Sequence, residues 1–178
     1  MKKVVIIVVS VVAAITIACL ILLGIFEGGF FFMAPSYNKM DRFLTENIEE
    51  LSYVADALSG LDYDAIVIRK NPHRSEDKYS MTVNVGMIYE TVPIPDELVV
   101  HIKKLFEIGV SIVSYNGNSV DFTTWNTMSE SRGIKYTRTG SLPEVWAAVE
   151  IKQLSKENWY YYVSNFEKAR ARNPHLFQ

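Results

Sequence analysis

The chain has 178 residues, a formal net charge of −2 and a hydrophobic fraction of 49%. This length suits one core-forming domain with an additional segment, and it is short for two domains. The net negative charge disfavours a nucleic-acid partner, because phosphate binding needs a basic surface.

An uncharged stretch covers residues 4–26. Roughly 20 apolar residues suffice to cross the hydrocarbon core of a bilayer as a helix. We therefore expect residues 1–26 to be an uncleaved transmembrane anchor, with the lipid bilayer as partner of residues 4–26. Small residues before Cys19 leave a lipoprotein attached at Cys19 as one alternative, and a cleaved secretory signal as another.

The orientation of this segment in the membrane rests on a small number of charged residues beside it. Lys2 and Lys3 precede it, and Lys39 and Arg42 follow within about 20 residues, so the positive-inside bias is small. The short basic head is typical of a signal anchor, and no Asn-x-Ser/Thr sequon is present. We expect a single-pass protein of a bacterial cytoplasmic membrane, with the amino terminus inside and the carboxyl-terminal domain outside.

Residues 27–36 mix Gly, Pro and Phe, and predict a juxtamembrane tether before a single domain at 37–178. A first helix is predicted from the N-cap Ser36 to Gly60. Its apolar residues recur at spacings of three and four, which forms one buried stripe: Met40, Leu44, Ile48, Leu51, Ala55 and Leu58.

The apolar period then changes to two. Residues 64–69 and the alternating run 79–89 predict two strands, joined by an exposed polar loop at 71–78. A second amphipathic helix is predicted from Pro95 to Gly109, with an apolar stripe at Leu98, Ile102, Leu105 and Phe106.

Further strands follow the second helix. Asn116-Gly117 predicts a hairpin, and Ile134–Arg138 predicts another strand. Residues 145–154 suit a helix or a strand, and we choose a strand paired with residues 158–164. A capping box at Ser164–Glu167 predicts a terminal helix that ends at Asn173-Pro174.

This order of elements predicts an α+β domain: an antiparallel sheet of about five to seven strands with helices packed on one face, preceded by a single transmembrane helix. The sequence contains no phosphate-binding glycine loop, nucleophile elbow or zinc-protease helix motif. His73, His101 and His175 have no metal-ligand spacing, so we predict no metal and no cofactor.

Acidic residues supply the only catalytic candidates. Asp62 and Asp64 would place two carboxylates on one strand face, as acid/base chemistry needs, and Asp121 is a third candidate. Without an identifiable partner, we interpret Asp62 and Asp64 as acids of a helix-to-strand loop.

A run of four aromatic residues, Trp159, Tyr160, Tyr161 and Tyr162, is the most unusual local feature. In a strand, two of them would enter the core and two would stay partly exposed, which predicts a binding face to which we add Trp125. Aromatic packing inside the sheet is the alternative. The basic tail, Lys168, Arg170 and Arg172, is interpreted as a partner for anionic lipid or for the acidic first helix.

Two classes of function remain open. The first is a membrane-anchored, non-catalytic domain that binds or neutralises an unknown protein partner. The alternative is a small surface hydrolase or carbohydrate-active enzyme that uses carboxylates. A cleft that gathers the acids would favour the enzyme, and an exposed aromatic strip would favour binding.

Overall fold

The computed structural model describes residues 34–71, 79–143, 145 and 147–172. The predicted anchor at 1–26, with Cys19, lies outside the described residues, as do most of the predicted tether, His73 and His175. Among the described residues, no helix combines the length and the apolar character that a membrane span requires.

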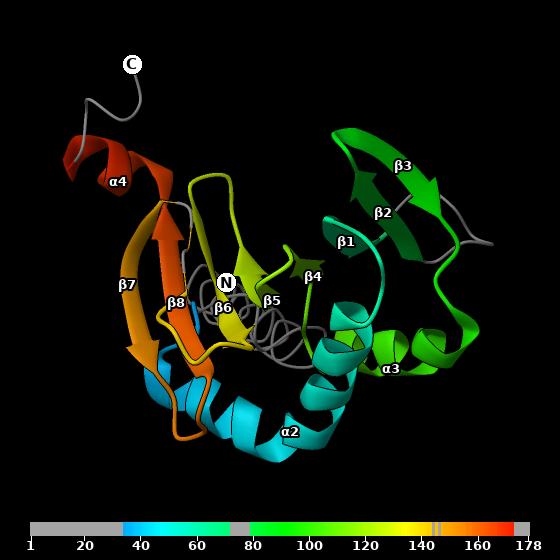
Figure 1. Cartoon of the computed structure of the whole chain (residues 1–178). Coiled ribbons are helices and arrows are strands. Elements are labelled where there is room, and N and C mark those ends of the chain that lie inside the picture. The colour runs from blue at the N-terminus through cyan, green and yellow to red at the C-terminus, as the bar shows by residue number, and fades with distance from the viewer. Residues whose placement is uncertain (1–33, 72–78, 144, 146, 173–178) are drawn as a thin grey trace, which may run out of the picture. The chain divides into compact units, whose positions relative to one another are not determined.

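Eight strands form one fully antiparallel sheet in the order β3-β2-β1-β4-β5-β6-β8-β7 (Figure 1). The predicted α+β class is confirmed, whereas the predicted five to seven strands are one too few. The elements are α2 (Tyr37–Ser59), β1 (Ala65–Lys70), β2 (Tyr79–Val85), β3 (Ile88–Val92), α3 (Asp96–Glu107), β4 (Ile112–Tyr115), β5 (Ser119–Asn126), β6 (Glu130–Thr137), β7 (Ala148–Gln153), β8 (Trp159–Asn165) and α4 (Phe166–Arg172).

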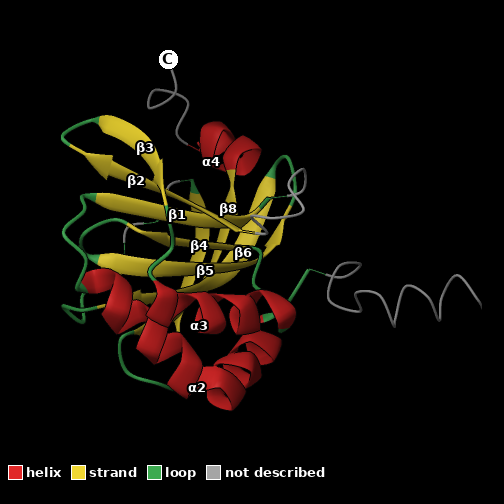
Figure 2. Cartoon of the chain, turned by 90° about the vertical axis from the view of Figure 1, so that its right-hand side faces the viewer, coloured by secondary structure: helices red, strands yellow, loops and turns green. Residues whose placement is uncertain are grey.

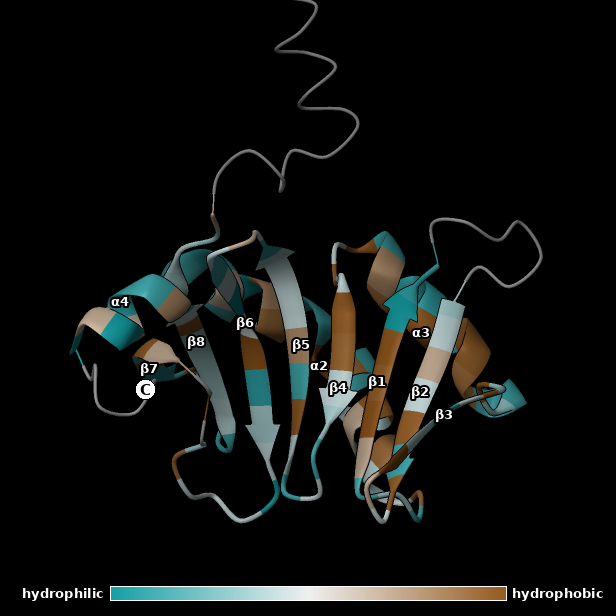
Figure 3. Cartoon of the chain, turned by 90° about the horizontal axis from the view of Figure 1, so that it is seen from above, coloured by the Kyte–Doolittle hydropathy of each residue, from teal (hydrophilic) through white to brown (hydrophobic). Residues whose placement is uncertain are grey.

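A helix followed by a three-strand meander occurs twice, first as α2-β1-β2-β3 and then as α3-β4-β5-β6. The strands β1 and β4 that begin the two meanders are neighbours in the middle of the sheet. Helices α2 and α3 lie together on one face of the sheet (Figures 2 and 3). Helix α4 instead contacts β7 and β8.

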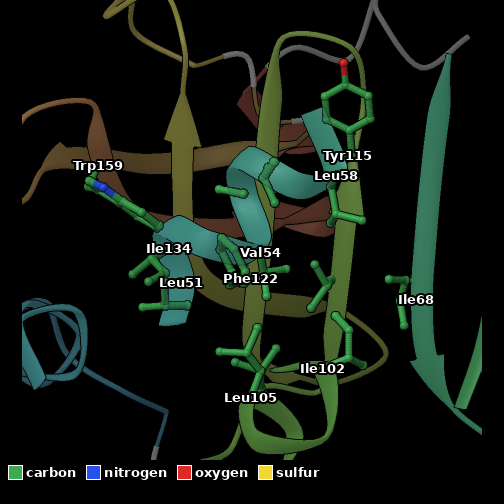
Figure 4. Packing of buried hydrophobic residues seen from close by; sticks show 14 of the residues in the cluster. Leu51, Val54, Leu58, Ile68, Ile102, Leu105, Tyr115, Phe122, Ile134 and Trp159 are labelled. Atoms are coloured by element: carbon green, nitrogen blue, oxygen red, sulfur yellow. The ribbon is translucent and has the colours of Figure 1, made fainter. Parts of the chain in front are cut away.

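The two predicted amphipathic helices are confirmed. Helix α2 begins after Ser36 and ends before Gly60, and its buried side includes Met40, Leu51 and Leu58. Helix α3 buries Leu98, Ile102 and Leu105. Figure 4 shows Leu51 and Val54 of α2 beside Phe122 and Ile134 of the sheet, so the predicted stripe forms the core between helices and strands.

The predicted single strand at 79–89 is wrong, because the chain reverses within it. Gly86 and Met87 both have positive φ angles, of 57° and 72°, and Val85 pairs with Ile88 across them. Two consecutive positive φ angles form the two-residue hairpin turn that fits the twist of antiparallel strands. The turn divides the run into β2 and β3 and supplies the eighth strand.

The predicted hairpin at Asn116-Gly117 and the predicted strand at 145–154 are confirmed, and the predicted cap of the terminal helix is displaced by one residue. The Asn116-Gly117 hairpin joins β4 to β5, and residues 148–153 form a strand paired with β8. The predicted capping box is wrong by one position, because Asn165 and not Ser164 caps α4. The Asn165 Oδ1 accepts a hydrogen bond of 2.9 Å from the Lys168 amide, the usual geometry of an N-cap side chain.

Candidate functional site

The structure does not bring the three candidate carboxylates into one cluster. Asp62 and Asp64 lie in the exposed loop between α2 and β1, as the loop interpretation predicted. The Asp64 Oδ2 accepts a hydrogen bond of 2.9 Å from the Gly86 amide, so this side chain supports the β2–β3 turn. Asp121 lies in β5. Among the described residues, no three His, Cys, Asp or Glu side chains gather as metal ligands.

Asp121 forms an ion pair within the sheet. Its Oδ2 lies 3.1 Å from the Nζ of Lys135 on β6, whose side chain is only 6% exposed. The Asp121 Oδ1 is buried and accepts no hydrogen bond from the described residues. Burial raises the pKa of Asp121, and Lys135 opposes that rise. Lys135 is buried and Asp121 is largely buried, so removing either partner would leave the other charge uncompensated in a poorly solvated place.

All four residues of the aromatic run are buried, so the expectation that two are partly exposed is wrong. Their exposed fractions are 2–6%. Trp159 and Tyr161 belong to the core on the side of the helices. The Tyr161 hydroxyl donates to the Pro35 carbonyl at 3.2 Å, and its ring meets Tyr37 edge to face. The start of α2 therefore covers this face of β8.

The opposite face of β8 is covered as well. The Tyr160 hydroxyl donates to the Gly140 carbonyl in the β6–β7 loop, and the Tyr162 hydroxyl lies 3.0 Å from the Thr123 Oγ1. Burial and the nearby Asp121 carboxylate raise the pKa of Tyr162 well above its ordinary value. Contacts from segments remote in sequence thus remove from solvent the surface that the sequence predicted as a binding face.

Trp125, the fifth predicted binding residue, is half-buried on β5. The guanidinium of Arg132 lies 5.6 Å from its ring centre, which is within cation–π distance. Arg132 also pairs with Glu130 at 2.6 Å. Trp125 is therefore covered in part by Arg132 and does not present a full aromatic face to solvent.

A polar cluster joins the two long helices. Glu50 of α2 is 8% exposed, and its carboxylate is bonded to His101 and Lys104 of α3. The His101 ring also stacks on Tyr53 with 4.0 Å between the ring centres. Burial alone raises the pKa of Glu50, but the bonds from Lys104 and His101 outweigh it and the pKa is lowered. This cluster fastens α3 to α2.

Exposed apolar side chains gather instead on the β2–β3 hairpin. The exposed fractions are 49% for Val85, 92% for Met87, 69% for Ile88 and 72% for Tyr89. Surface apolar residues are ordinary when scattered singly, whereas a group of them indicates an interaction site. These four residues, together with Glu90 and Thr91 of β3, are called the β3 edge below.

Strand β3 is paired with β2 on one side, and the backbone groups on its other side point away from the sheet. The Asn84 carbonyl accepts a hydrogen bond from the Asp64 amide, so the backbone N–H and C=O groups of Asn84 point toward β1. The backbone groups of Val83 and Val85 therefore point the other way, toward β3. Since backbone directions alternate along a strand, Tyr89 and Thr91 direct their N–H and C=O groups away from β2. No described strand pairs with that outer side.

The turn gives a second indication that the β3 edge has a role beyond folding. Met87 adopts a φ of 72°, a conformation that costs most side chains on the order of 1 kcal/mol. Glycine would avoid this cost. An apolar side chain that is strained and almost fully exposed adds nothing to the core.

The opposite edge of the sheet, β7, is protected. A register shift between Ala148 and Glu150 interrupts its pairing. The Gln153 carbonyl accepts a hydrogen bond of 2.8 Å from the Tyr37 hydroxyl, and Arg172 of α4 donates to the Val149 carbonyl. Exposed Lys152 pairs with Glu150 at 2.6 Å. Bulges, charged side chains and covering contacts are the devices by which sheets block added strands.

No protein-family model, curated protein or solved structure matches this chain. The β3 edge is therefore identified as the candidate site from its exposed side chains and its place in the sheet alone. Sequence reasoning missed the β3 edge because alternation appeared to continue from Tyr79 to Tyr89. The signal that it passed over is Gly86 followed by three consecutive apolar residues, Met87, Ile88 and Tyr89.

Proposed function

We propose that the chain is a membrane-anchored, non-catalytic binding domain on the outer side of a bacterial cytoplasmic membrane, and that its β3 edge binds an extended segment of a partner protein. The observation that carries the proposal is that no described strand pairs with the outer side of β3, and that the β2–β3 hairpin exposes four apolar side chains at this edge. An extended peptide can add a strand to such an edge through its main-chain hydrogen bonds.

The β3 edge also restricts the chemistry of the partner. Tyr89 and Thr91 would supply the main-chain hydrogen bonds, and apolar partner residues would contact Ile88 and Tyr89. Glu90 is the charged side chain of β3. Opposite charges across neighbouring strands stabilise their pairing, so a Lys or Arg opposite Glu90 is expected. The partner segment is therefore apolar, basic and extended.

Photocrosslinking in native membranes tests this proposal. A benzoylphenylalanine replaces Tyr89 in the full chain, and a matched chain carries it at Lys152 on the protected β7 edge. We expect position 89 to crosslink to one defined apolar, basic segment and position 152 to give no such product. Crosslinking of the same segment from both positions, or of no segment from position 89, would contradict the proposal.

A pair of proline substitutions shows whether main-chain bonding is involved. Thr91→Pro removes an N–H that points outward, whereas Glu90→Pro removes one that bonds to β2. We expect Thr91→Pro to abolish the crosslink while the melting temperature stays nearly constant. Glu90→Pro should lower the melting temperature instead. A crosslink that persists in Thr91→Pro would exclude strand addition.

A further inference from the structure

We propose that a second surface of the domain, formed by Met128, Phe166 and the cationic helix α4, rests on anionic phospholipid headgroups. This inference rests on the membrane anchor in the proposed function and is independent of the β3 edge. Met128, Phe166, Lys168, Arg170 and Arg172 are called the lipid-facing surface below.

The first argument is where the chain joins the sheet. The Pro35 carbonyl accepts hydrogen bonds of 3.2 Å from both the Arg132 Nη1 and the Tyr161 hydroxyl. Arg132 in turn pairs with Glu130, the first residue of β6 after the β5–β6 turn. Pro35 is therefore fixed near the end of the sheet at which that turn lies.

Chain length limits how far this end can be from a bilayer. The uncharged run ends at Phe26, which leaves residues 27–34 before Pro35. A fully extended chain spans at most about 3.5 Å per residue, so these residues reach roughly 28 Å. If residues 4–26 cross the bilayer, the end of the sheet that holds Pro35 lies within about 28 Å of the membrane end of that segment.

Apolar side chains are exposed at this same end. Met128 in the β5–β6 turn is fully exposed, and Phe166 at the start of α4 is 37% exposed. The Phe166 amide donates to the Ser129 carbonyl, so α4 begins beside that turn. Exposed apolar and aromatic groups enter the boundary between headgroups and acyl chains when a protein surface lies on a membrane.

Charge gives an independent argument for anionic lipid. Lys168, Arg170 and Arg172 are exposed on α4, where Glu167 is the single acid. The chain as a whole has a net charge of −2, so α4 is a local exception. Clustered Lys and Arg residues beside a membrane segment are attracted to anionic headgroups.

The β3 edge lies at the other end of the strands. Along β5, Thr123 pairs with Ile112 and Val120 with Tyr115, and Tyr115 pairs with Ile66 at the end of β1 near the β2–β3 turn. The β5–β6 and β2–β3 turns thus lie at opposite ends of the sheet. A strand of eight residues spans about 26 Å. A domain that rests on lipid through Met128 therefore leaves Met87 available to a protein partner.

Lipid-quenching fluorescence tests the lipid-facing surface in the full chain. In a Cys19→Ser background, a single cysteine at Met128 or at Met87 carries an environment-sensitive fluorophore. The chains are reconstituted into phosphatidylcholine vesicles, with or without about one-third phosphatidylglycerol, that contain quencher-labelled lipid. We expect strong quenching at position 128 in the anionic vesicles and little quenching at position 87.

Charge reversal identifies the contribution of α4. The combined variant Lys168→Glu, Arg170→Glu and Arg172→Glu should reduce quenching at position 128 severalfold. Arg138→Glu, an exposed cation at the far end of β6, should leave it unchanged. Circular dichroism of each variant checks that the fold persists, and Arg170→Gln alone should give a smaller reduction in the same direction.

Each other outcome overturns the inference in a distinguishable way. Equal quenching at position 128 with and without phosphatidylglycerol would exclude recognition of anionic lipid. A chain that floats with vesicles but shows no quenching at position 128 would exclude the surface and leave the β3 edge proposal intact. A chain that does not float with vesicles would show that residues 4–26 do not anchor it, which would contradict this inference as well. Stronger quenching at position 87 would contradict both proposals.

Discussion

The two edges of the sheet differ in how completely the chain covers them. On the β7 side, the neighbouring strand β8 is buried on both faces, and the edge itself is occupied by side chains from α2 and α4. On the β3 side, Met87, Ile88 and Tyr89 are exposed, and no described strand pairs with the outer backbone groups. Edge strands that are not blocked are templates for added strands. The residues of the covered β7 side are therefore expected to stabilise the fold, and those of the β3 edge are the candidates for binding.

The largest effect is expected from the buried ion pair on the covered side. Lys135→Ala leaves the Asp121 carboxylate without its cation, and should lower the free energy of unfolding by about 3–5 kcal/mol. The loss should shrink at low pH, because the raised pKa of Asp121 lets the carboxyl group accept a proton. Urea denaturation at several pH values measures both effects.

Two controls accompany this substitution. Lys152→Ala removes the cation of an exposed pair at the β7 edge and should change stability far less than Lys135→Ala, because water screens an exposed pair. Replacing Asp121 by Asn together with Lys135 by Met should recover most of the loss. A similar loss from Lys135→Ala and Lys152→Ala would show that the Lys135–Asp121 pair is no better shielded from water than the exposed pair at the β7 edge.

The aromatic run gives the next effect. Since Tyr160 and Tyr161 are both buried, Tyr160→Ala and Tyr161→Ala should each lower stability by about 3 kcal/mol. The sequence alone predicts that only one of them destabilises and that the other weakens partner capture. Thermal melts combined with crosslinking from position 89 decide between these expectations. An unchanged melting temperature for either variant would return β8 to the binding candidates.

Acid should weaken the contact between α2 and α3. Because the pKa of Glu50 is lowered in the folded chain, its contribution to stability is present at neutral pH and is lost as the pH falls through that lowered pKa. Glu50→Gln should cost about 1–2 kcal/mol at neutral pH. The stability of this variant should converge with that of the natural chain once the pH lies below the lowered pKa of Glu50, because the carboxyl group is then protonated.

The smallest change in stability is expected from a substitution at Met87, which should affect binding more than folding. Met87→Gly relieves the positive φ angle and should leave stability unchanged or raise it by up to about 1 kcal/mol. The same substitution removes an exposed apolar side chain, so the crosslink yield from position 89 should fall. A stability gain with an unchanged yield would show that Met87 is dispensable and that binding depends on Ile88 and Tyr89.

Local sequence patterns determined much of this fold. The apolar stripes from Met40 to Leu58 and from Leu98 to Leu105 predicted both long helices, because each helix buries one face at a period of 3.6 residues. The Asn116-Gly117 turn fixed one hairpin through its own backbone preferences. Such features depend on residues close in sequence, so the sequence by itself specifies them.

Only the tertiary structure decided the turn at Met87, the burial of the aromatic run and the identity of the open edge. Met87 occupies a turn position that usually takes Gly or Asn, so its local signal is weak. Tyr160 and Tyr161 are covered by Gly140 and Pro35, which lie about 20 and 126 residues away in the chain. Strand order likewise depends on pairings between distant segments, so β3 becomes an uncovered edge only when the whole sheet has formed.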